Sequence, residues 1–132
     1  MATFRFDLVA PDNFVFTGQV SQVDLPGIEG DMGVLAGHAP LVTTLRPGII
    51  VIYTEGVQQR LVVSGGFAEV GPGGLTVLAN MAVPQDEFDT ALLAGEIKDT
   101  EEDVADEQDA LKRDKLSRKL DQLKALQAAL AA

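Results

Sequence analysis

The sequence predicts an α+β protein in which an N-terminal all-β sandwich of about ten short strands is followed by a C-terminal α-helical hairpin. Twelve of the 13 glycines and all six prolines fall in residues 1–84, whereas residues 85–132 hold one glycine, no proline and nine alanines. Apolar and polar residues alternate in the first part, and leucines recur at helical spacing in the second. We therefore expect two domains, 1–84 and 85–132, with their boundary near Pro84.

Short apolar segments separated by turn residues define the predicted strands. Phe4, Phe6 and Leu8 alternate with Arg5 and Asp7, which predicts a first strand with one buried face. Further strands are expected at 14–16, 19–25, 33–35, 41–45, 48–54, 60–64, 67–70, 75–79 and 81–83. Glycine, proline or polar residues predict turns between them, at 11–13, 26–27, 37–40, 47–48, 55–56, 65–66 and 71–74. Such regular punctuation is typical of a β-sandwich, and the apolar run 49–52 predicts a strand that is covered on both faces.

Two apolar stripes predict the helical hairpin. The first stripe comprises Phe88, Leu92, Leu93, Ile97 and Val104. The second comprises Leu116, Leu120, Leu123, Leu126 and Leu130. Helices of this length are marginally stable alone, so we expect the two to pack antiparallel and to dock on the sandwich. Asp86 is expected to cap the first helix, with Asp89 three positions on. No glycine or proline marks the turn, which we place within 98–108; one continuous helix is the alternative.

The composition favours a protein partner over other kinds of ligand. The net charge of −10 disfavours nucleic acid and anionic membrane surfaces as primary partners. No cysteine and a single histidine, His38, leave no thiolate or multi-histidine metal site. The N-terminus lacks a signal-peptide pattern, and no apolar run approaches the roughly 20 residues that span a bilayer. We expect a soluble cytosolic protein with no cofactor, no metal and no direct membrane insertion.

Charge is unevenly distributed along the predicted hairpin. Residues 96–109 contain eight carboxylates and one lysine, whereas residues 110–126 contain six bases and two carboxylates. One interpretation is a solvated surface on which the two segments attract each other weakly. The other is a basic segment that binds an acidic protein surface, because Lys112, Lys115 and Lys119 share one helix face beside the leucines.

Catalysis is disfavoured by the residues present. His38 lies in a predicted turn without a serine, aspartate or cysteine partner pattern. The turn 71–74 lacks the Gly-Lys-Ser/Thr ending of a phosphate-binding loop. Asp24, Glu29 and Asp31 are the carboxylates that a small hydrolase could use, but the chain has no tryptophan and one tyrosine on which a sugar could stack. We expect no catalytic residue.

Several strings of residues, in order along the chain, resemble the epsilon subunit of bacterial F-type rotary ATP synthases. The longest is the glycine- and proline-rich string from Gly27 to Gly48. The others are Phe6-Asp7-Leu8-Val9, Phe16-Thr17-Gly18, Ser64-Gly65-Gly66-Phe67-Ala68-Glu69-Val70 and Leu75-Thr76-Val77-Leu78-Ala79. Together they cover most of residues 4–83. The helical half matches that family in length, charge and alanine-leucine character.

The resemblance implies a non-catalytic central-stalk (rotor) subunit of a proton-driven ATP synthase, which couples the gamma subunit to the c-ring. It implies c-ring contacts at Glu29, Gly30 and Asp31, and gamma contacts at His38 and Thr43. It also implies that the C-terminal helices restrain ATP hydrolysis by reaching the alpha and beta subunits. The residues expected to act there are Lys112, Arg113, Lys115, Arg118, Lys119, Leu116, Leu120 and Leu123. Such a subunit would be peripheral, at the cytoplasmic face of the inner (plasma) membrane.

The resemblance leaves one family feature unmatched. Some members of the family bind ATP through a hairpin motif that contains an arginine, and residues 87–94 contain none. We therefore expect no bound nucleotide. The alternative function is a stand-alone β-sandwich adaptor whose basic helical tail binds another acidic protein.

Overall fold

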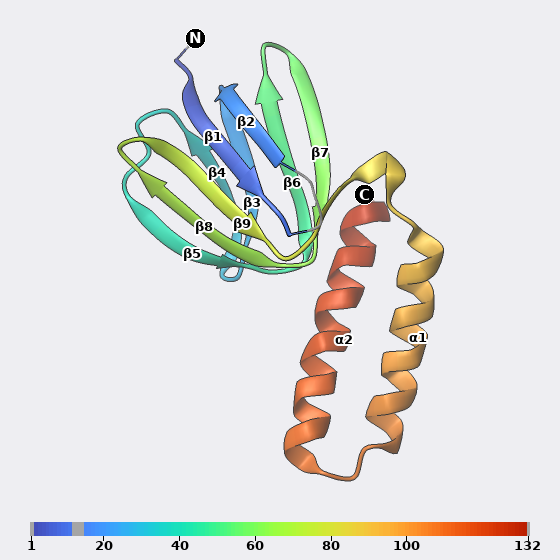
Figure 1. The fold of residues 1–132 in the computed structure, drawn as a ribbon. Helices are drawn as coiled ribbons and strands as arrows, with labels where there is room; N and C mark the ends of the chain where they lie inside the picture. Colours follow the sequence, from blue (N-terminus) through green and yellow to red (C-terminus); the bar gives the residue numbers. More distant parts are fainter. Residues whose placement is uncertain (1, 12–14, 132) are drawn as a thin grey trace. The chain divides into compact units, whose positions relative to one another are not determined.

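The computed structural model describes residues 2–11 and 15–131 of the chain (Figure 1). The chain divides into two compact units, Met1–Phe88 and Asp89–Ala132. Within the described residues, the first unit contains ten strands and a short 3-10 helix, and the second contains two α-helices. The predicted order of an all-β part followed by a helical hairpin is therefore confirmed.

The ten strands are short and follow one another closely. They are β1 (Phe4–Val9), β2 (Val15–Val20), β3 (Gln22–Gly27), β4 (Gly30–Leu35), β5 (Leu41–Leu45), β6 (Gly48–Thr54), β7 (Val57–Val63), β8 (Gly66–Gly71), β9 (Gly74–Ala79) and β10 (Ala82–Pro84). Nearly all neighbours pair antiparallel, and β1 and β9 pair parallel. The predicted turn at Glu55-Gly56 is confirmed: both residues have positive φ, 44° and 81°, as a type I′ hairpin turn requires.

One continuous sheet folds over to make the two layers of the sandwich. Its strand order is β10-β7-β6-β3-β5-β8-β9-β1-β2, with β4 added on β3. The fold-over occurs between β3 and β5, which share only the pair Gly27 and Leu45. The side chains that point inward from both layers form one apolar core. Its largest fully buried members are Phe6, Leu8, Leu25, Ile50, Ile52, Leu61 and Leu75.

Strand β6 is buried on both faces, as the run 49–52 predicts. Ile50 and Ile52 belong to the central core. Val51 points to the opposite face and is buried as well, and so is its neighbour Val62 on β7. Continuous apolar sequence of this kind is typical of a strand without a solvent-exposed side.

Two predicted boundaries in the strands are wrong. The predicted strand 19–25 is broken at Ser21, where the chain passes from β2 to β3. The predicted turn at Pro26-Gly27 lies inside β3, and the chain turns at Ile28 and Glu29 instead. Pro26 is tolerated there because the strand uses its carbonyl oxygen, which accepts a hydrogen bond from the Arg46 backbone N–H at 2.9 Å. Residue 14 of the predicted strand 14–16 lies outside the described residues.

The segment after β10 stays with the sandwich, whereas the sequence predicts a domain boundary directly after residue 84. Residues Gln85–Glu87 form a 3-10 helix. The Arg60 Nε–H of β7 donates a hydrogen bond to the Gln85 side-chain oxygen at 2.7 Å, which ties this segment to the sheet. The compact unit accordingly extends to Phe88.

The second unit is an antiparallel pair of helices, α1 (Thr90–Asp106) and α2 (Ala110–Ala131), which pack side by side (Figure 1). The cap of α1 is Asp89, whose carboxylate accepts hydrogen bonds from the backbone N–H groups of Ala91 and Leu92. The prediction that Asp86 caps the helix is wrong, because Asp86 belongs to the preceding 3-10 helix. The chain reverses at residues 107–109, so the alternative of one continuous helix is not what the structure shows.

The predicted stripes correspond to the packed helix faces, apart from Phe88, which precedes α1 and belongs to the sandwich unit, and with one exception on α1 itself. On α1, Leu93, Ile97 and Thr100 are buried. On α2, Leu126 is buried, and the stripe residues Leu116, Leu120, Leu123 and Leu130 are partly buried. The exception is Leu92, which is 71% exposed, beside Leu93, which is 3% exposed. Adjacent positions on a helix lie about 100° apart, so only one of the two leucines faces the partner helix.

This contrast gives a matched test of hairpin packing. We expect Leu93→Ala to lower the stability of the helical unit by about 2–4 kcal/mol, because it removes a buried side chain. We expect Leu92→Ala to change it by less than about 0.5 kcal/mol. Thermal melting followed by circular dichroism at helix wavelengths measures both. Equal effects of the two substitutions would contradict the packing described.

Candidate functional site

The tip of the β3–β4 hairpin brings together all three predicted c-ring contact residues, Glu29, Gly30 and Asp31. The last strand pair is Gly27 and Gly30, which leaves Ile28 and Glu29 as a two-residue turn. Glu29, Gly30 and Asp31 are all exposed, and so is the Ile28 side chain. The tip thus presents one exposed apolar side chain together with two exposed carboxylates.

Arg46 connects this tip to the next strand. Its guanidinium donates one hydrogen bond to the Gly27 carbonyl oxygen and a second to the Asp31 carboxylate. The backbone is joined at the same place, since the Ile28 N–H donates to the Thr44 carbonyl oxygen at 2.9 Å. Sequence reasoning did not identify Arg46, which lies fifteen residues from Asp31 and becomes its neighbour only through the fold-over of the sheet.

The two predicted gamma contacts are not brought together. His38 lies in the loop between β4 and β5, where its Nδ1–H donates to the Ala39 carbonyl oxygen at 2.7 Å. It lines an open cleft of about 540 Å³ beside the β8–β9 turn. Thr43 lies in the middle of β5, opposite the core residue Ala68, so its side chain faces the inner side of the sheet.

An apolar patch on the outer face of the sheet was not predicted from the sequence. Phe67 on β8 pairs with Leu78 on β9, and Leu78 pairs with Val9 on β1, so the three side chains lie in one row across the strands. Val42 lies on the adjoining strand β5, diagonal to Phe67. The four side chains are between 40% and 58% exposed. We call these four residues the apolar patch.

A signal for the apolar patch is present in the sequence. On β1, β8 and β9 the inward positions are occupied by Leu8, Ala68 and Val77, so the residue adjacent to each of them on its strand should be polar. Val9, Phe67 and Leu78 break this alternation. Large exposed apolar side chains that are contiguous across strands mark an interaction surface.

Asp24, a carboxylate that a hydrolase could use, is occupied by structural hydrogen bonds. The Tyr53 hydroxyl donates to Asp24 Oδ2 at 2.7 Å, and the Gln22 amide donates to Oδ1 at 2.7 Å. The hydrogen bond to Asp24 and then partial burial raise the pKa of Tyr53 above its ordinary value. Asp24 is therefore a structural acceptor on β3, while Glu29 and Asp31 lie at the hairpin tip.

Tyr53 is the only tyrosine of the chain, so its ionisation can be followed directly by phenolate absorbance. We expect a midpoint above the ordinary value of about 10, and we expect Asp24→Ala to lower it toward that value. Because the folded pKa is the higher one, the stabilisation is complete below pH about 10 and is lost as the pH rises through the folded pKa. The control Glu69→Ala should leave the midpoint unchanged. A wild-type midpoint at the ordinary value would contradict the hydrogen bond.

All three arginines of the sandwich unit are engaged, and the unit has no lysine. Arg5 donates to the Asp7 carboxylate and to the Thr17 hydroxyl, each at 3.1 Å. The Thr17 hydroxyl bond and then the Arg5 guanidinium lower the pKa of Asp7. Arg60 bonds Gln85, and Arg46 bonds the hairpin tip. With nine carboxylates in residues 1–88, the surface of the sandwich is strongly acidic.

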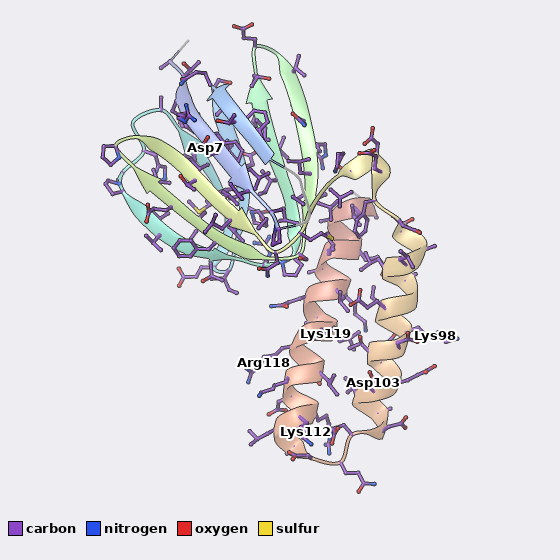
Figure 2. All side chains as sticks on the ribbon, viewed as in Figure 1. Asp7, Lys98, Asp103, Lys112, Arg118 and Lys119 are labelled. Atoms are coloured by element: carbon purple, nitrogen blue, oxygen red, sulfur yellow. The ribbon has the colours of Figure 1, made fainter. Side chains whose placement is uncertain are left out.

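The predicted basic residues of α2 divide into two groups. Lys119 lies on the side of α2 that faces α1 (Figure 2), with its Nζ 3.8 Å from the Glu96 carboxylate. Lys124 pairs similarly with Glu101 at 3.6 Å. Arg118 projects away from α1 (Figure 2), and neither it nor Lys112 nor Lys115 forms an ion pair with any residue that the structure describes. The weak attraction between the two segments is therefore observed at Lys119 and Lys124, and the binding of an acidic protein surface by the other basic residues stays a prediction.

Arg113 serves the turn between the helices. Its guanidinium donates to the carbonyl oxygens of Glu107 at 3.0 Å and Gln108 at 3.2 Å. The Asp109 carboxylate accepts from the backbone N–H of Leu111 at 2.9 Å and so caps α2. These side chains satisfy backbone groups at the helix ends, which explains how the chain reverses here without glycine or proline.

The described residues, 2–11 and 15–131, contain neither a candidate metal site nor a candidate membrane-spanning helix. No group of three or more histidine, aspartate or glutamate side chains gathers there in a way that could hold a metal ion. None of the helices in the same residues is long and apolar enough to cross a membrane.

Comparison with known proteins places these features in a family. Residues 3–85 match the family model described as ATP synthase, Delta/Epsilon chain, beta-sandwich domain. The ATP synthase epsilon chain of Rhodopseudomonas palustris (strain BisB18) is 51% identical over 127 residues, which is 96% of this chain and 93% of that protein. The epsilon chain of Parvibaculum lavamentivorans is 53% identical over 123 residues, covering 92% of this chain and 93% of that one.

Solved structures agree with this match. A chain in the Euglena gracilis mitochondrial ATP synthase (OSCP/F1/c-ring) superposes with a TM-score of 0.82 at 32% identity, covering 98% of this chain and 82% of that chain. A chain of the Tetrahymena thermophila central stalk and c-ring has the same fold, with a TM-score of 0.68 at 13% identity and 96% coverage of both chains. This protein, a β-sandwich followed by a helical hairpin, therefore belongs to the family of ATP synthase epsilon chains.

Proposed function

We propose that this chain is a non-catalytic rotor subunit that couples the gamma subunit to the c-ring of a proton-driven ATP synthase. The observation that carries this proposal is the apolar patch. Other exposed apolar side chains of the sandwich, such as Ile28 and Val57, lie elsewhere, whereas Val9, Val42, Phe67 and Leu78 are contiguous across four strands. Such a surface fits a permanently bound protein partner. The named relatives and the assemblies that contain the structural neighbours support an ATP synthase as the setting.

In this proposal the two partners use different parts of the sandwich. The gamma subunit packs on the apolar patch, and His38 would meet it from the cleft beside the β8–β9 turn, at the other end of strands β8 and β9. Thr43 stays a predicted gamma contact, although its side chain points to the inner side of β5. The c-ring meets the exposed tip of the β3–β4 hairpin at Glu29, Gly30 and Asp31. A glycine-tight sandwich is stiff enough to transmit torque between two such surfaces.

The helical unit acts in this proposal as a restraint on ATP hydrolysis. Lys112, Lys115 and Arg118 supply positive charge that is free to meet acidic surfaces of the alpha and beta subunits. Lys119 can bind such a surface only if its ion pair with Glu96 is broken. Arg113 can do so only if its hydrogen bonds to the turn between the helices are broken. The leucines at 116, 120 and 123 are partly buried between the helices, so they can exchange one apolar contact for another. The complex would lie at the cytoplasmic face of the inner (plasma) membrane, with this subunit peripheral.

A capture experiment tests the rotor assignment. Full-length chain carrying an affinity tag is added to detergent extracts of the membranes of its own source. We expect it to retrieve the gamma subunit and the c-ring. Retrieval of neither would contradict the rotor assignment. Retrieval of an unrelated acidic protein alone would favour the adaptor function instead.

Truncation tests the regulatory assignment separately. We expect a chain ending at Phe88, the limit of the sandwich unit, to assemble and to support ATP synthesis, because the proposed rotor contacts lie before that residue. We expect ATP hydrolysis by the assembled complex to rise by about fivefold or more, since coupling between sites is typically worth at least about 1 kcal/mol. Unchanged hydrolysis would show that the helices do not restrain the enzyme.

A further inference from the structure

The strongest observation outside the proposed contacts is the side chain of Arg46. It reaches from the end of β5 to two groups on the β3–β4 hairpin, the Gly27 carbonyl oxygen and the Asp31 carboxylate. The Asp31 side chain is 81% exposed and that of Arg46 is 30% exposed, so the arginine is the more fixed of the pair. Two contacts from one planar guanidinium to two different groups constrain the direction of the side chain as well as its distance.

The surroundings make the base of the hairpin rigid. Backbone hydrogen bonds join Arg46 to Pro26 and Ile28 to Thr44, each at 2.9 Å. Pro26 packs so tightly on the next strand that a Cβ added at Gly48 would lie 2.6 Å from the Pro26 Cβ. Beyond the Ile28 N–H, the side chains of Ile28 and Glu29 are exposed at the turn itself. The Arg46 guanidinium is the side-chain contact that extends order from the base to the tip.

The same contact gives the two carboxylates of the tip different surroundings. Asp31 is matched by Arg46, whereas Glu29 forms no ion pair with any residue that the structure describes. The remaining arginines of the sandwich are engaged elsewhere. Glu29 is therefore the uncompensated charge of the tip, beside the exposed Ile28 side chain.

From this geometry we infer that Arg46 is a positioning residue of the hairpin tip, and that Glu29, not Asp31, pairs with a cationic side chain of the c-ring. The second half of this inference, the pairing of Glu29 with the c-ring, rests on the proposed function. Asp31 acts through Arg46 by holding the turn, and Glu29 acts by direct charge pairing with Ile28 as an apolar neighbour.

The first half is tested on the free full-length chain. Amide hydrogen exchange at Ile28, Glu29 and Gly30 is measured by NMR in wild type, Arg46→Gln and Arg46→Lys. We expect exchange at least about threefold faster in Arg46→Gln, with partial recovery in Arg46→Lys, which keeps the charge but loses the fork. The matched control is Arg60→Gln, which makes the same substitution at a sandwich arginine that hydrogen-bonds Gln85 instead of the hairpin tip. Wild-type exchange in Arg46→Gln would overturn the positioning role.

The second half is tested by affinity for a purified, detergent-solubilised complex of c-ring and gamma subunit. We expect Arg46→Gln and Asp31→Asn each to weaken binding by about three- to fivefold, and the double variant to be no weaker than either, because the two act as one unit. We expect Glu29→Gln to weaken binding independently, multiplying the effect of Arg46→Gln, and to reduce the dependence of affinity on salt.

The outcomes separate the inference from the proposed function. Binding by wild type, with a salt dependence that Asp31→Asn removes and Glu29→Gln does not, would overturn the assignment of Glu29 and leave the rotor function standing. No binding by wild type would remove the rotor function and the Glu29 pairing together. The exchange measurement would still decide the role of Arg46 in that case.

Discussion

Replacing Gly74 by alanine should lower the free energy of unfolding of the sandwich by about 3 kcal/mol or more. Gly74 has a φ of +127°, which side chains rarely adopt. A Cβ at this position would lie 2.2 Å from the carbonyl oxygen of Arg5, a backbone atom that no rotamer change can move. The substitution therefore combines backbone strain with a clash between two paired strands.

The neighbouring turn residue supplies a matched control. A Cβ added at Gly73 meets nothing within 4 Å, and its φ lies outside the strained range. We expect Gly73→Ala to change stability by less than about 1 kcal/mol in either direction. Urea unfolding followed by circular dichroism at sheet wavelengths measures both variants. Similar stabilities for the two would show that β1 and β9 can separate without loss, contrary to the structure.

The clash matters for the proposed function because of where it falls. Gly74 begins β9, and the parallel pairing of β9 with β1 starts directly afterwards at Leu75 and Phe6. The same two strands carry Leu78 and Val9 of the apolar patch on their outer faces. A change that separates β1 from β9 would therefore disturb the core and the proposed gamma surface together. We accordingly expect Gly74→Ala to weaken binding of the gamma subunit as well as to lower stability.

Local patterns in the sequence were sufficient to predict most of the fold. Alternation along a strand identifies which side chains face inward, so Phe6 and Leu8 were assigned to the core correctly. The course of β3 through Pro26 could not be predicted in this way. It depends on hydrogen bonds to Thr44 and Arg46, which are almost twenty residues away and come near only when the sheet folds over.

In the helical hairpin, too, local sequence patterns predicted the helices but not the details that depend on contacts between them. Leucine spacing predicted two packed faces, yet it could not show which of Leu92 and Leu93 faces the other helix, since both lie near the predicted stripe. The reversal at residues 107–109 is specified by the Asp109 cap and the Arg113 contacts. Polar side chains of this kind occur at many positions in an acidic segment, so their capping role emerges only from geometry.

Prediction of the candidate site was least complete where it depends on several strands at once. Glu29, Gly30 and Asp31 are adjacent in sequence, so the resemblance placed them at one tip. The apolar patch draws single residues from four segments between Val9 and Leu78, and each residue alone is unremarkable. Only the register of β5, β8, β9 and β1 joins them into a surface.

Introducing a charge into this surface should have the largest effect on partner binding. We expect Leu78→Glu to weaken affinity for the gamma subunit by about 30-fold or more, because a carboxylate at the centre of an apolar contact would be buried without a partner. Leu78 occupies the middle of the row, between Phe67 and Val9. Its side chain is half exposed in the free chain, so stability should change by no more than about 0.5–1 kcal/mol.

The control is Val57→Glu, which places the same charge on an exposed valine of β7, in the other layer of the sandwich. Val57 is 62% exposed, at least as exposed as any residue of the apolar patch, so exposure alone cannot account for a difference between the variants. Binding is measured by titration of labelled gamma subunit with each full-length chain, after urea unfolding has shown both to be folded. If Leu78→Glu binds gamma as tightly as Val57→Glu does, the apolar patch is not the gamma surface, and the rotor assignment loses the observation that carries it.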